Sequence, residues 1–140
     1  NEVCDLAFED AFTQHMQWNA QKGAPYVIDH DRDLLARINQ GDMVEGVTIS
    51  AGGFYGPQGR KLRIPLEDPD QNETTPSFEY DGQRITNFEM EGSAIAGLSR
   101  LLGHKAMTVC CVIAQRKVEA ANTDYKPRIK QLVETVLERI

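Results

Sequence analysis

The stretch Val44–Ser50, VEGVTIS, is rich in β-branched residues and is followed at once by residues that cannot continue a strand. Valine, isoleucine and threonine favour extended backbone because their branched side chains pack well on a pleated surface. The next ten residues, Ala51–Arg60 or AGGFYGPQGR, contain four glycines and a proline, which favour turns. The sequence therefore predicts a buried strand that ends in an irregular loop.

Helical patterns lie on both sides of this strand. Asp5–Trp18 and Asp31–Asn39 carry apolar residues mostly three or four positions apart, and Gly41 follows the second segment. The same spacing recurs in Glu91–Leu102, where Gly103 supplies a plausible C-terminal stop. Such spacing places the apolar side chains on one face of a helix.

The longest helical pattern closes the chain. We expect Thr123 or Asp124 to cap its N-terminus, and Pro127 is tolerated in a first helical turn. Its apolar residues should form a stripe that packs on the core: Ile129, Leu132, Val133, Val136, Leu137 and Ile140.

Further extended segments separate these helices. Ala106–Ala114, AMTVCCVIA, is almost continuously apolar, as is typical of strands covered on both faces. Phe78–Ile85 contains Asp81-Gly82 between two short extended runs, which predicts a hairpin. Pro65–Ser77 is polar and contains three prolines, so we expect a long mobile loop. The alternation of helices and strands predicts an α/β fold, with helices packed around a mixed central sheet.

Composition narrows the functional classes. The chain has 140 residues, one domain or part of one, and a net charge of −6 without a lysine or arginine cluster, which argues against nucleic-acid binding. It has no apolar run of the roughly 20 residues that a membrane helix needs, and its polar opening residues do not fit a secretory signal. Cys4, Cys110 and Cys111 lack metal-site spacing, so we expect buried free thiols in a reducing cytoplasm. The three histidines have no partners at informative spacing, and we expect structural or surface roles for them.

The loop after the first strand carries the first candidate binding residues, Phe54, Gln58 and Arg60. It leaves the C-terminal end of a strand, where open α/β sheets bind their ligands. An amide donates and accepts hydrogen bonds, a guanidinium donates in a planar fork, and an aromatic ring can stack. Together they suit a flat heterocycle such as uracil. The alternative is an ordinary surface loop with solvated side chains.

The second candidate group is Glu89-Met90-Glu91. In a continuous helix, residues two apart point in different directions, so both carboxylates can face one site only if a strand ends and a helix begins there. They could then accept hydrogen bonds from sugar hydroxyls. One alternative is that Glu91 is a favourable charge at a helix N-terminus while Glu89 is exposed. Another is a glycosidase-like acid and base pair.

The third candidate group, Ala114-Gln115-Arg116, ends the second predicted strand. Arg116 could support Arg60 or orient Gln58 there, or it could simply reach solvent.

In this order the three groups resemble the nucleoside phosphorylase family, and within it the uridine phosphorylases. The resemblance runs from about Asp31 onward, and its matching stretches are Thr48–Ser50 with Phe54–Arg60, Asn87–Glu91 and Val112–Arg116. The combination of Gln-x-Arg with Glu-Met-Glu favours the pyrimidine branch, as does the lack of an aspartate after the second strand. The chain departs from many relatives at Gly92 and Gln115, without removing a proposed contact.

The resemblance implies an activity and a role for each site residue. The reaction would be reversible phosphorolysis of uridine to uracil and ribose 1-phosphate. Gln58 and Arg60 would read the uracil edge and Phe54 would pack on its ring, with Arg60 also stabilising the charge that develops in the reaction. Met90 and Glu91 would hold the ribose, Glu91 through the 2′-hydroxyl of the sugar, and Glu89 would lie close by. Arg116 would lie near Gln58 and Arg60.

The resemblance also implies what this chain lacks. Family members are about twice as long and carry the phosphate site in their N-terminal half, so residues 1–140 correspond to the C-terminal portion of one three-layer domain. We expect a cytoplasmic homo-oligomer built from dimers, such as a hexamer, with phosphate as co-substrate and without a metal or organic cofactor. Two alternatives stay open: a nucleoside hydrolase-type relative on the same fold, and a non-catalytic nucleoside-binding module.

Overall fold

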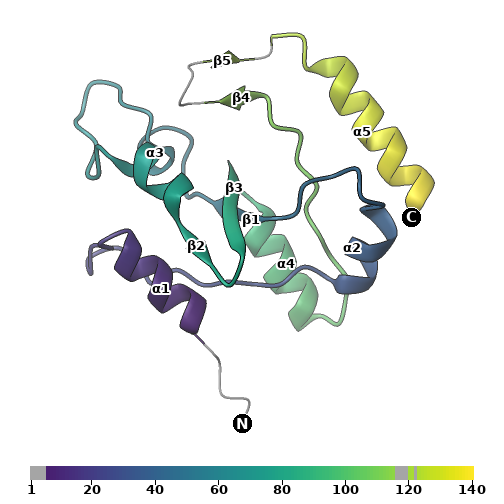
Figure 1. Cartoon of the computed structure of the whole chain (residues 1–140), viewed down its shortest axis with the longest axis horizontal. Coiled ribbons are helices and arrows are strands. Elements are labelled where there is room, and N and C mark those ends of the chain that lie inside the picture. The colour runs from purple at the N-terminus through teal and green to yellow at the C-terminus, as the bar shows by residue number, and fades with distance from the viewer. Residues whose placement is uncertain (1–5, 116–119, 122) are drawn as a thin grey trace. The chain divides into compact units, whose positions relative to one another are not determined.

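The computed structural model describes residues 6–115, 120–121 and 123–140. The chain divides into two compact units, one made of Asn1–Ile28 and Gly46–Ser93, the other of Asp29–Glu45 and Ala94–Ile140. Helices and strands are interspersed along the chain, and the larger sheet contains both parallel and antiparallel pairs, as Figure 1 shows. The predicted α/β class is therefore confirmed.

The first unit contains a three-stranded sheet in the order β1-β3-β2. β1 (Val47–Ser50) pairs in parallel with β3 (Gln83–Glu89), and β2 (Glu79–Tyr80) pairs with β3 in antiparallel orientation. The parallel register places Ser50 opposite Glu89, so both strands end at the same edge of the sheet. β1 is shorter than its predicted stretch and is only half-buried.

The predicted hairpin joins β2 to β3. Asp81 and Gly82 have φ angles of 48° and 73°, the left-handed values that a two-residue turn between twisted strands requires. Asparagine, aspartate and glycine adopt this region most readily. The local sequence thus determines the turn, and the prediction is confirmed.

The core of this unit is aromatic. α1 (Ala7–His15) lies alongside the β2–β3 hairpin (Figure 1) and buries Phe12 against Phe78, with ring centroids 5.3 Å apart in an edge-to-face arrangement. Phe8 contacts Phe78 in the same way, also at 5.3 Å. The helix is shorter than the predicted one because Gln17 adopts a φ of 47°, which ends it.

The prediction of a mobile loop at Pro65–Ser77 is wrong in its second half. This part contains α3 (Gln71–Thr74) and a 3-10 helix, η2 (Thr75–Ser77), and the Thr75 side chain is buried. Nε2 of His15 lies 3.1 Å from both the carbonyl oxygen of Thr74 and the hydroxyl of Ser77. Contacts with α1 therefore hold the segment, and His15 has the structural role that we expected.

The second unit begins with α2 (Arg32–Ile38), whose N-terminus is capped by Asp31. The Asp31 carboxylate accepts a hydrogen bond of 3.0 Å from the backbone N–H of Leu34, and Gly41 follows the helix with a φ of 88°. α4 (Gly92–Leu101), which begins at the boundary between the units, ends as predicted before Gly103, whose φ is 74°. Both helices thus follow their predicted positions closely.

The C-terminal helix α5 (Lys126–Arg139) is present, but its predicted cap is wrong. Tyr125 occupies the N-cap position, and neither Thr123 nor Asp124 does; the Tyr125 side chain makes no capping hydrogen bond. At its other end Arg139 donates hydrogen bonds to both carboxylate oxygens of Asp42, at 2.9 and 2.8 Å. The Arg139 hydrogen bond is the main cause that lowers the pKa of Asp42 to about 2.

The predicted strand at Ala106–Ala114 is largely absent. Only its last residue joins β4 (Ala114–Gln115), which pairs with β5 (Ala120–Ala121) in a two-stranded antiparallel sheet. The β-rich composition favours extended backbone, but a strand also needs a neighbour to complete its ladder. Cys110 and Cys111 form no disulfide bond, as predicted, but Cys110 is exposed and Cys111 is only partly buried, so the predicted burial is wrong for both; Cys4 lies outside the described residues.

The apolar stripe of α5 is also more exposed than predicted. Val133 is 50% exposed and Leu137 is 68% exposed, and α4 shows the same property, with Leu98 at 60%. Amphipathic helices gain most of their stability by burying such a face. The stripes were correctly located by their spacing, but these residues do not pack into a core here.

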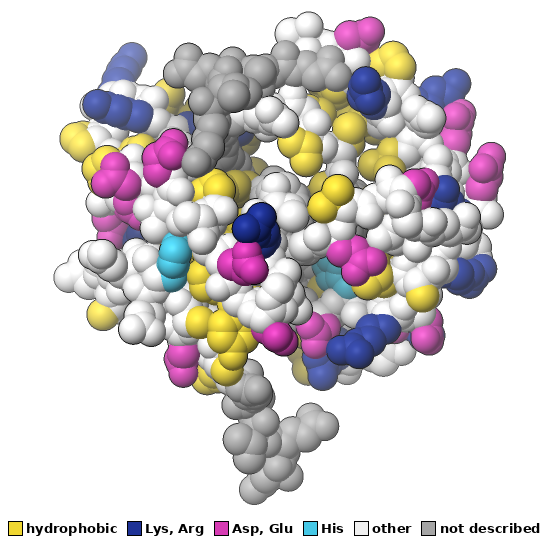
Figure 2. Space-filling view, in the orientation of Figure 1, with side chains coloured by type: hydrophobic (Ala, Val, Ile, Leu, Met, Phe, Trp, Pro, Cys, Tyr) yellow, Lys and Arg dark blue, Asp and Glu magenta, His cyan; other side chains and the backbone are white. Residues whose placement is uncertain are grey.

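The face shown in Figure 2 intersperses basic and acidic side chains among hydrophobic ones. None of the helices in the described parts of the chain is long and apolar enough to cross a membrane.

Candidate functional site

The loop after β1 is irregular, as predicted, apart from a single 3-10 turn, η1 (Gly56–Gln58). The carbonyl oxygen of Tyr55 accepts hydrogen bonds from the backbone N–H groups of Gln58, at 3.1 Å, and Arg60, at 2.9 Å. Gly59 between them has a φ of 68°, a conformation that glycine adopts at little cost. This turn brings the side chains of Gln58 and Arg60 to the same side.

The three side chains predicted for base binding lie together in this loop. The Arg60 guanidinium donates hydrogen bonds of 2.7 Å to the Gln58 amide oxygen and 2.6 Å to the Phe54 carbonyl oxygen. It also lies over the Phe54 ring, 3.7 Å from the ring centroid, a cation–π contact. Gln58 is buried, whereas Phe54 is half exposed, so the cluster offers an aromatic surface next to a fixed planar donor.

Two amides of α3 hold this loop and were not predicted. Gln71 donates a hydrogen bond of 2.8 Å to the Pro57 carbonyl oxygen, and Asn72 donates one of 2.9 Å to the Gly59 carbonyl oxygen. A Cβ atom on Gly59 would lie 2.6 Å from the Asn72 amide oxygen, so the packing requires glycine. No pattern in the sequence indicates this contact, because the two amides lie in a polar segment that is typical of a solvated loop.

Glu89-Met90-Glu91 spans the junction of strand and helix. Glu89 is the last residue of β3 and Gly92 is the first of α4, so the change of backbone that we required for a shared site does occur here. Met90 is 41% exposed and the Glu91 side chain is exposed, whereas Glu89 is partly buried. The two carboxylates therefore have different surroundings.

The Glu89 carboxylate is held by hydrogen bonds within the protein. It accepts from the Ser50 hydroxyl and from the backbone N–H groups of Glu91, at 2.8 Å, and Gly92, at 2.6 Å. Burial alone would raise the pKa of Glu89, but these hydrogen bonds outweigh it, and the pKa lies below its ordinary value. The carboxylate is accordingly ionised at neutral pH.

Ser50 links this carboxylate to the next helix. Its hydroxyl oxygen accepts a hydrogen bond of 2.8 Å from the backbone N–H of Ser93, while the hydroxyl donates to Glu89. The neighbouring pair on the same two strands, Thr48 and Asn87, is hydrogen-bonded at 2.9 Å. Ser50 was part of a matching stretch but was not predicted as a site residue, since its partner lies 39 positions away along the chain.

The two candidate groups arise from the same edge of the sheet. The backbone N–H of Ala51, where the loop begins, donates a hydrogen bond of 2.8 Å to the carbonyl oxygen of Glu89, where β3 ends. The carboxyl ends of adjacent parallel strands are the usual ligand-binding edge of an α/β sheet. The prediction that the first two candidate groups follow the ends of strands is therefore confirmed.

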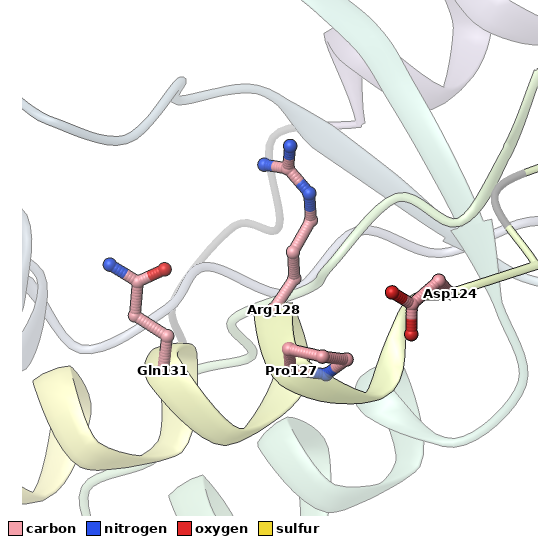
Figure 3. A pocket seen from close by; sticks show the side chains of 4 residues that line it. All are labelled: Asp124, Pro127, Arg128 and Gln131. Atoms are coloured by element: carbon pink, nitrogen blue, oxygen red, sulfur yellow. The ribbon is translucent and has the colours of Figure 1, made fainter.

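The third candidate group is described only in part. Ala114 and Gln115 form β4 and are exposed, whereas Arg116 lies outside the described residues. Figure 3 shows a surface hollow on α5, and the described residues that line it are Asp124, Pro127, Arg128 and Gln131, none of which is a predicted site residue. Within the described parts of the chain, no three His, Cys, Asp or Glu side chains are grouped so as to hold a metal ion.

Comparison with known proteins identifies relatives of this chain. The family model of the phosphorylase superfamily matches residues 2–138. A uridine phosphorylase from Thermococcus kodakarensis is 36% identical over 77 residues, which are 51% of this chain and 25% of that protein. A crystal structure of a Trypanosoma brucei nucleoside phosphorylase, reported to show uridine phosphorylase activity, matches with a TM-score of 0.77 and 25% identity, covering 99% of this chain and 50% of that one.

The residues matched by the family model include both segments at the edge of the sheet. The chain spans at most half the length of the two relatives. The family model nevertheless covers nearly all of it, including the loop after β1 and the junction after β3. The chain therefore belongs to the phosphorylase superfamily and has the nucleoside phosphorylase fold.

Proposed function

We propose that this chain supplies the base- and ribose-binding residues of an enzyme that converts uridine and phosphate to uracil and ribose 1-phosphate. The observation that carries the proposal is the cluster of Gln58 and Arg60 beside the Phe54 ring, with the guanidinium 2.7 Å from the amide oxygen. The uridine phosphorylase relatives described above support the choice of substrate.

The cluster suits the chemistry of a uracil ring. Uracil presents carbonyl, N–H and carbonyl groups along one edge, which an amide and a guanidinium can pair with. The exposed part of the Phe54 ring offers a surface for stacking. Because Arg60 holds the amide oxygen of Gln58, the two side chains are oriented before the base arrives.

Arg60 also has a role in the bond cleavage. The bond between ribose C1′ and uracil N1 breaks, and its electron pair passes to the uracil ring. A phosphate oxygen forms the new bond to C1′, where positive charge has developed. A fixed donor such as Arg60 stabilises the anionic base, and preorganised stabilisation of this kind is usually a large catalytic contribution.

Met90 and Glu91 would bind the sugar. Both side chains extend from the junction after β3 and are exposed, so a ribose can reach them. The Glu91 carboxylate would accept a hydrogen bond from the 2′-hydroxyl, and Met90 would contact the apolar face of the ring. We further propose, on the basis of the sequence, that Glu89 lies close to the sugar and Arg116 near the base.

The phosphate site completes the proposal. The chain covers 50% of the solved relative, and we place the phosphate-binding residues in a segment outside these 140 residues. Phosphate is the co-substrate, and the reaction as proposed uses no metal or organic cofactor. We further propose a cytoplasmic pyrimidine salvage enzyme, assembled as a dimer-based homo-oligomer.

The test is an ultraviolet assay of uridine loss by the full-length gene product, with and without phosphate. Loss of uridine and formation of ribose 1-phosphate only when phosphate is present would support phosphorolysis. Equal rates without phosphate would indicate a hydrolase instead. Binding of uridine without consumption would indicate a binding module and contradict the proposed activity.

A further inference from the structure

The two glutamates of the junction after β3 differ in what they contact. Three donors already surround the Glu89 carboxylate: the Ser50 hydroxyl and the N–H groups of Glu91 and Gly92. A carboxylate offers about four acceptor positions, so most of its capacity is used within the protein. The Glu91 side chain is exposed at the same junction.

The groups joined by these hydrogen bonds come from three elements of the fold. Ser50 ends β1, Glu89 ends β3, and Gly92 begins α4. The backbone N–H of Ser93 donates to Ser50 at 2.8 Å, and the Tyr26 hydroxyl donates to the Ser93 hydroxyl at 3.0 Å. One connected set of hydrogen bonds thus joins two strand ends to the first turn of a helix.

We propose that Glu89 is a positioning residue, which together with Ser50 fixes the backbone of residues 90–93 so that Met90 and Glu91 present their side chains outward. The presentation of those two side chains to a ribose rests on the proposed function. The fixing of the backbone does not, because it follows from the hydrogen bonds alone.

A carboxylate is better suited to this task than an amide. The first N–H groups of a helix have no partners within the helix, and they carry partial positive charge. Glu89 accepts from two such groups with a single oxygen, Oε2, and from Ser50 with the other. A glutamine keeps one neutral acceptor oxygen, which accepts from the backbone N–H groups more weakly than a carboxylate does, and its amide N–H would reverse the hydrogen bond with Ser50.

Amide hydrogen exchange of the full-length gene product tests the fixing of the backbone. Glu89→Gln should speed exchange at Glu91 and Gly92 by about tenfold, since a hydrogen bond to a charged group is lost. The matched variant Glu91→Gln should leave these rates unchanged. Equal rates in Glu89→Gln and the parent chain would overturn the proposal.

A second pair of variants protects the test against general unfolding. Ser50→Ala should speed exchange at Ser93, and Ser50→Thr, which keeps the hydroxyl, should restore protection. If Glu89→Gln speeds exchange throughout the chain, the comparison of the two Ser50 variants decides the question. The role of the hydroxyl would be refuted if Ser93 exchanged as fast in Ser50→Thr as in Ser50→Ala.

Kinetics of the full-length gene product separate positioning from direct sugar contact. Glu89→Gln should lower kcat/KM for uridine and 2′-deoxyuridine by the same factor, because it displaces the whole junction. Glu91→Gln should lower kcat/KM mainly for uridine, which alone has the 2′-hydroxyl. A loss in Glu89→Gln that is confined to uridine would overturn the proposal in favour of direct contact. If the parent enzyme consumes neither nucleoside, the proposed function fails, and the exchange experiment still decides the role of Glu89.

Discussion

The loop after β1 and the junction after β3 leave the same edge of the sheet but are held in different ways. Neutral amides of α3 hold the loop: Gln71 donates to the Pro57 carbonyl oxygen and Asn72 to that of Gly59. The junction is held by a charge, the Glu89 carboxylate, on backbone N–H groups of its own segment. The two halves of one candidate site therefore depend on different interactions.

The difference has consequences for energy and for pH. A hydrogen bond between neutral groups contributes about 1 kcal/mol to stability, and one to a charged group contributes about 1.5–3 kcal/mol. The first kind does not change with pH, whereas the second is lost when the carboxylate is protonated. Variants on the two sides should therefore behave differently, and each of the following predictions tests one side.

The largest effect is expected for Arg60, because it orients Gln58 and, in the proposed function, also donates to the substrate. In the full-length enzyme, Arg60→Ala should lower kcat/KM for uridine by about 10²–10³-fold, the range for removing one preorganised donor. The stability of the fold should change little, since the contacts of the Arg60 guanidinium with the described residues lie within its own loop. Steady-state assays together with urea unfolding would measure both quantities.

Arg63 supplies a matched control for this variant. It lies three residues further on and is exposed, and Arg63→Ala removes the same charge from the same region. Its kcat/KM should stay within about twofold of the parent value, because surface changes of this kind have small effects. Wild-type-like turnover in Arg60→Ala would contradict the base-anion role and leave Arg60 with a structural one.

The second effect concerns the dependence of stability on pH. The folded-state pKa of Glu89 lies below its ordinary value of 4.5, so the ionised carboxylate stabilises the fold above about pH 4.5. That contribution is lost as the pH falls below this value and through the folded-state pKa. Glu89→Gln should therefore be less stable than the parent by about 1–2 kcal/mol at pH 7, and the difference should shrink toward pH 3.

Glu91→Gln is the control for the pH experiment. Its carboxylate is exposed and, among the described residues, has no hydrogen bond of this kind, so urea unfolding should give the same free energy as the parent within about 0.5 kcal/mol. A constant difference between Glu89→Gln and the parent from pH 7 to pH 3 would show that charge is not what holds the junction. The junction after β3 and the loop after β1 would then not differ in the dependence of their support on charge.

The parts of the fold that could be predicted are those fixed by nearby residues. Asp81-Gly82 determines its turn through left-handed φ angles, and Gly103 ends α4 for the same reason. The strand at 106–114 was wrongly predicted because composition indicates an extended backbone, not a neighbour to pair with. The helix α3 was missed because its stability comes from contacts with α1, which no local pattern reveals.

In the candidate site, too, contacts between nearby residues could be predicted and contacts between distant residues could not. The residue types and spacing in Gln58, Arg60 and Phe54 were sufficient to predict that they act together, and the structure brings them together. The role of Glu89 could not be predicted, because its partner Ser50 lies opposite it only through the register of two parallel strands. Side chains that read a ligand are visible in sequence when they share a loop, whereas those that support them often are not.

The smallest effect is expected for Asn72, on the neutral side of the comparison. Asn72→Ala removes one hydrogen bond to the Gly59 carbonyl oxygen, so the chain should lose about 1 kcal/mol of stability at every pH between 7 and 3. The KM for uridine should rise several-fold in the full-length enzyme, because the loop that carries Gln58 and Arg60 loses one of its two supports from α3.

Gln14→Ala, on the exposed face of α1, is the control, because it shortens an exposed amide side chain to the same methyl group. It should change neither stability nor KM measurably. Since Asn72 carries no charge, a loss of stability in Asn72→Ala that varied with pH would mean that the loop is coupled to a titrating group. In that case the loop after β1 and the junction after β3 would respond as one unit, and the distinction between neutral and charged support would not hold.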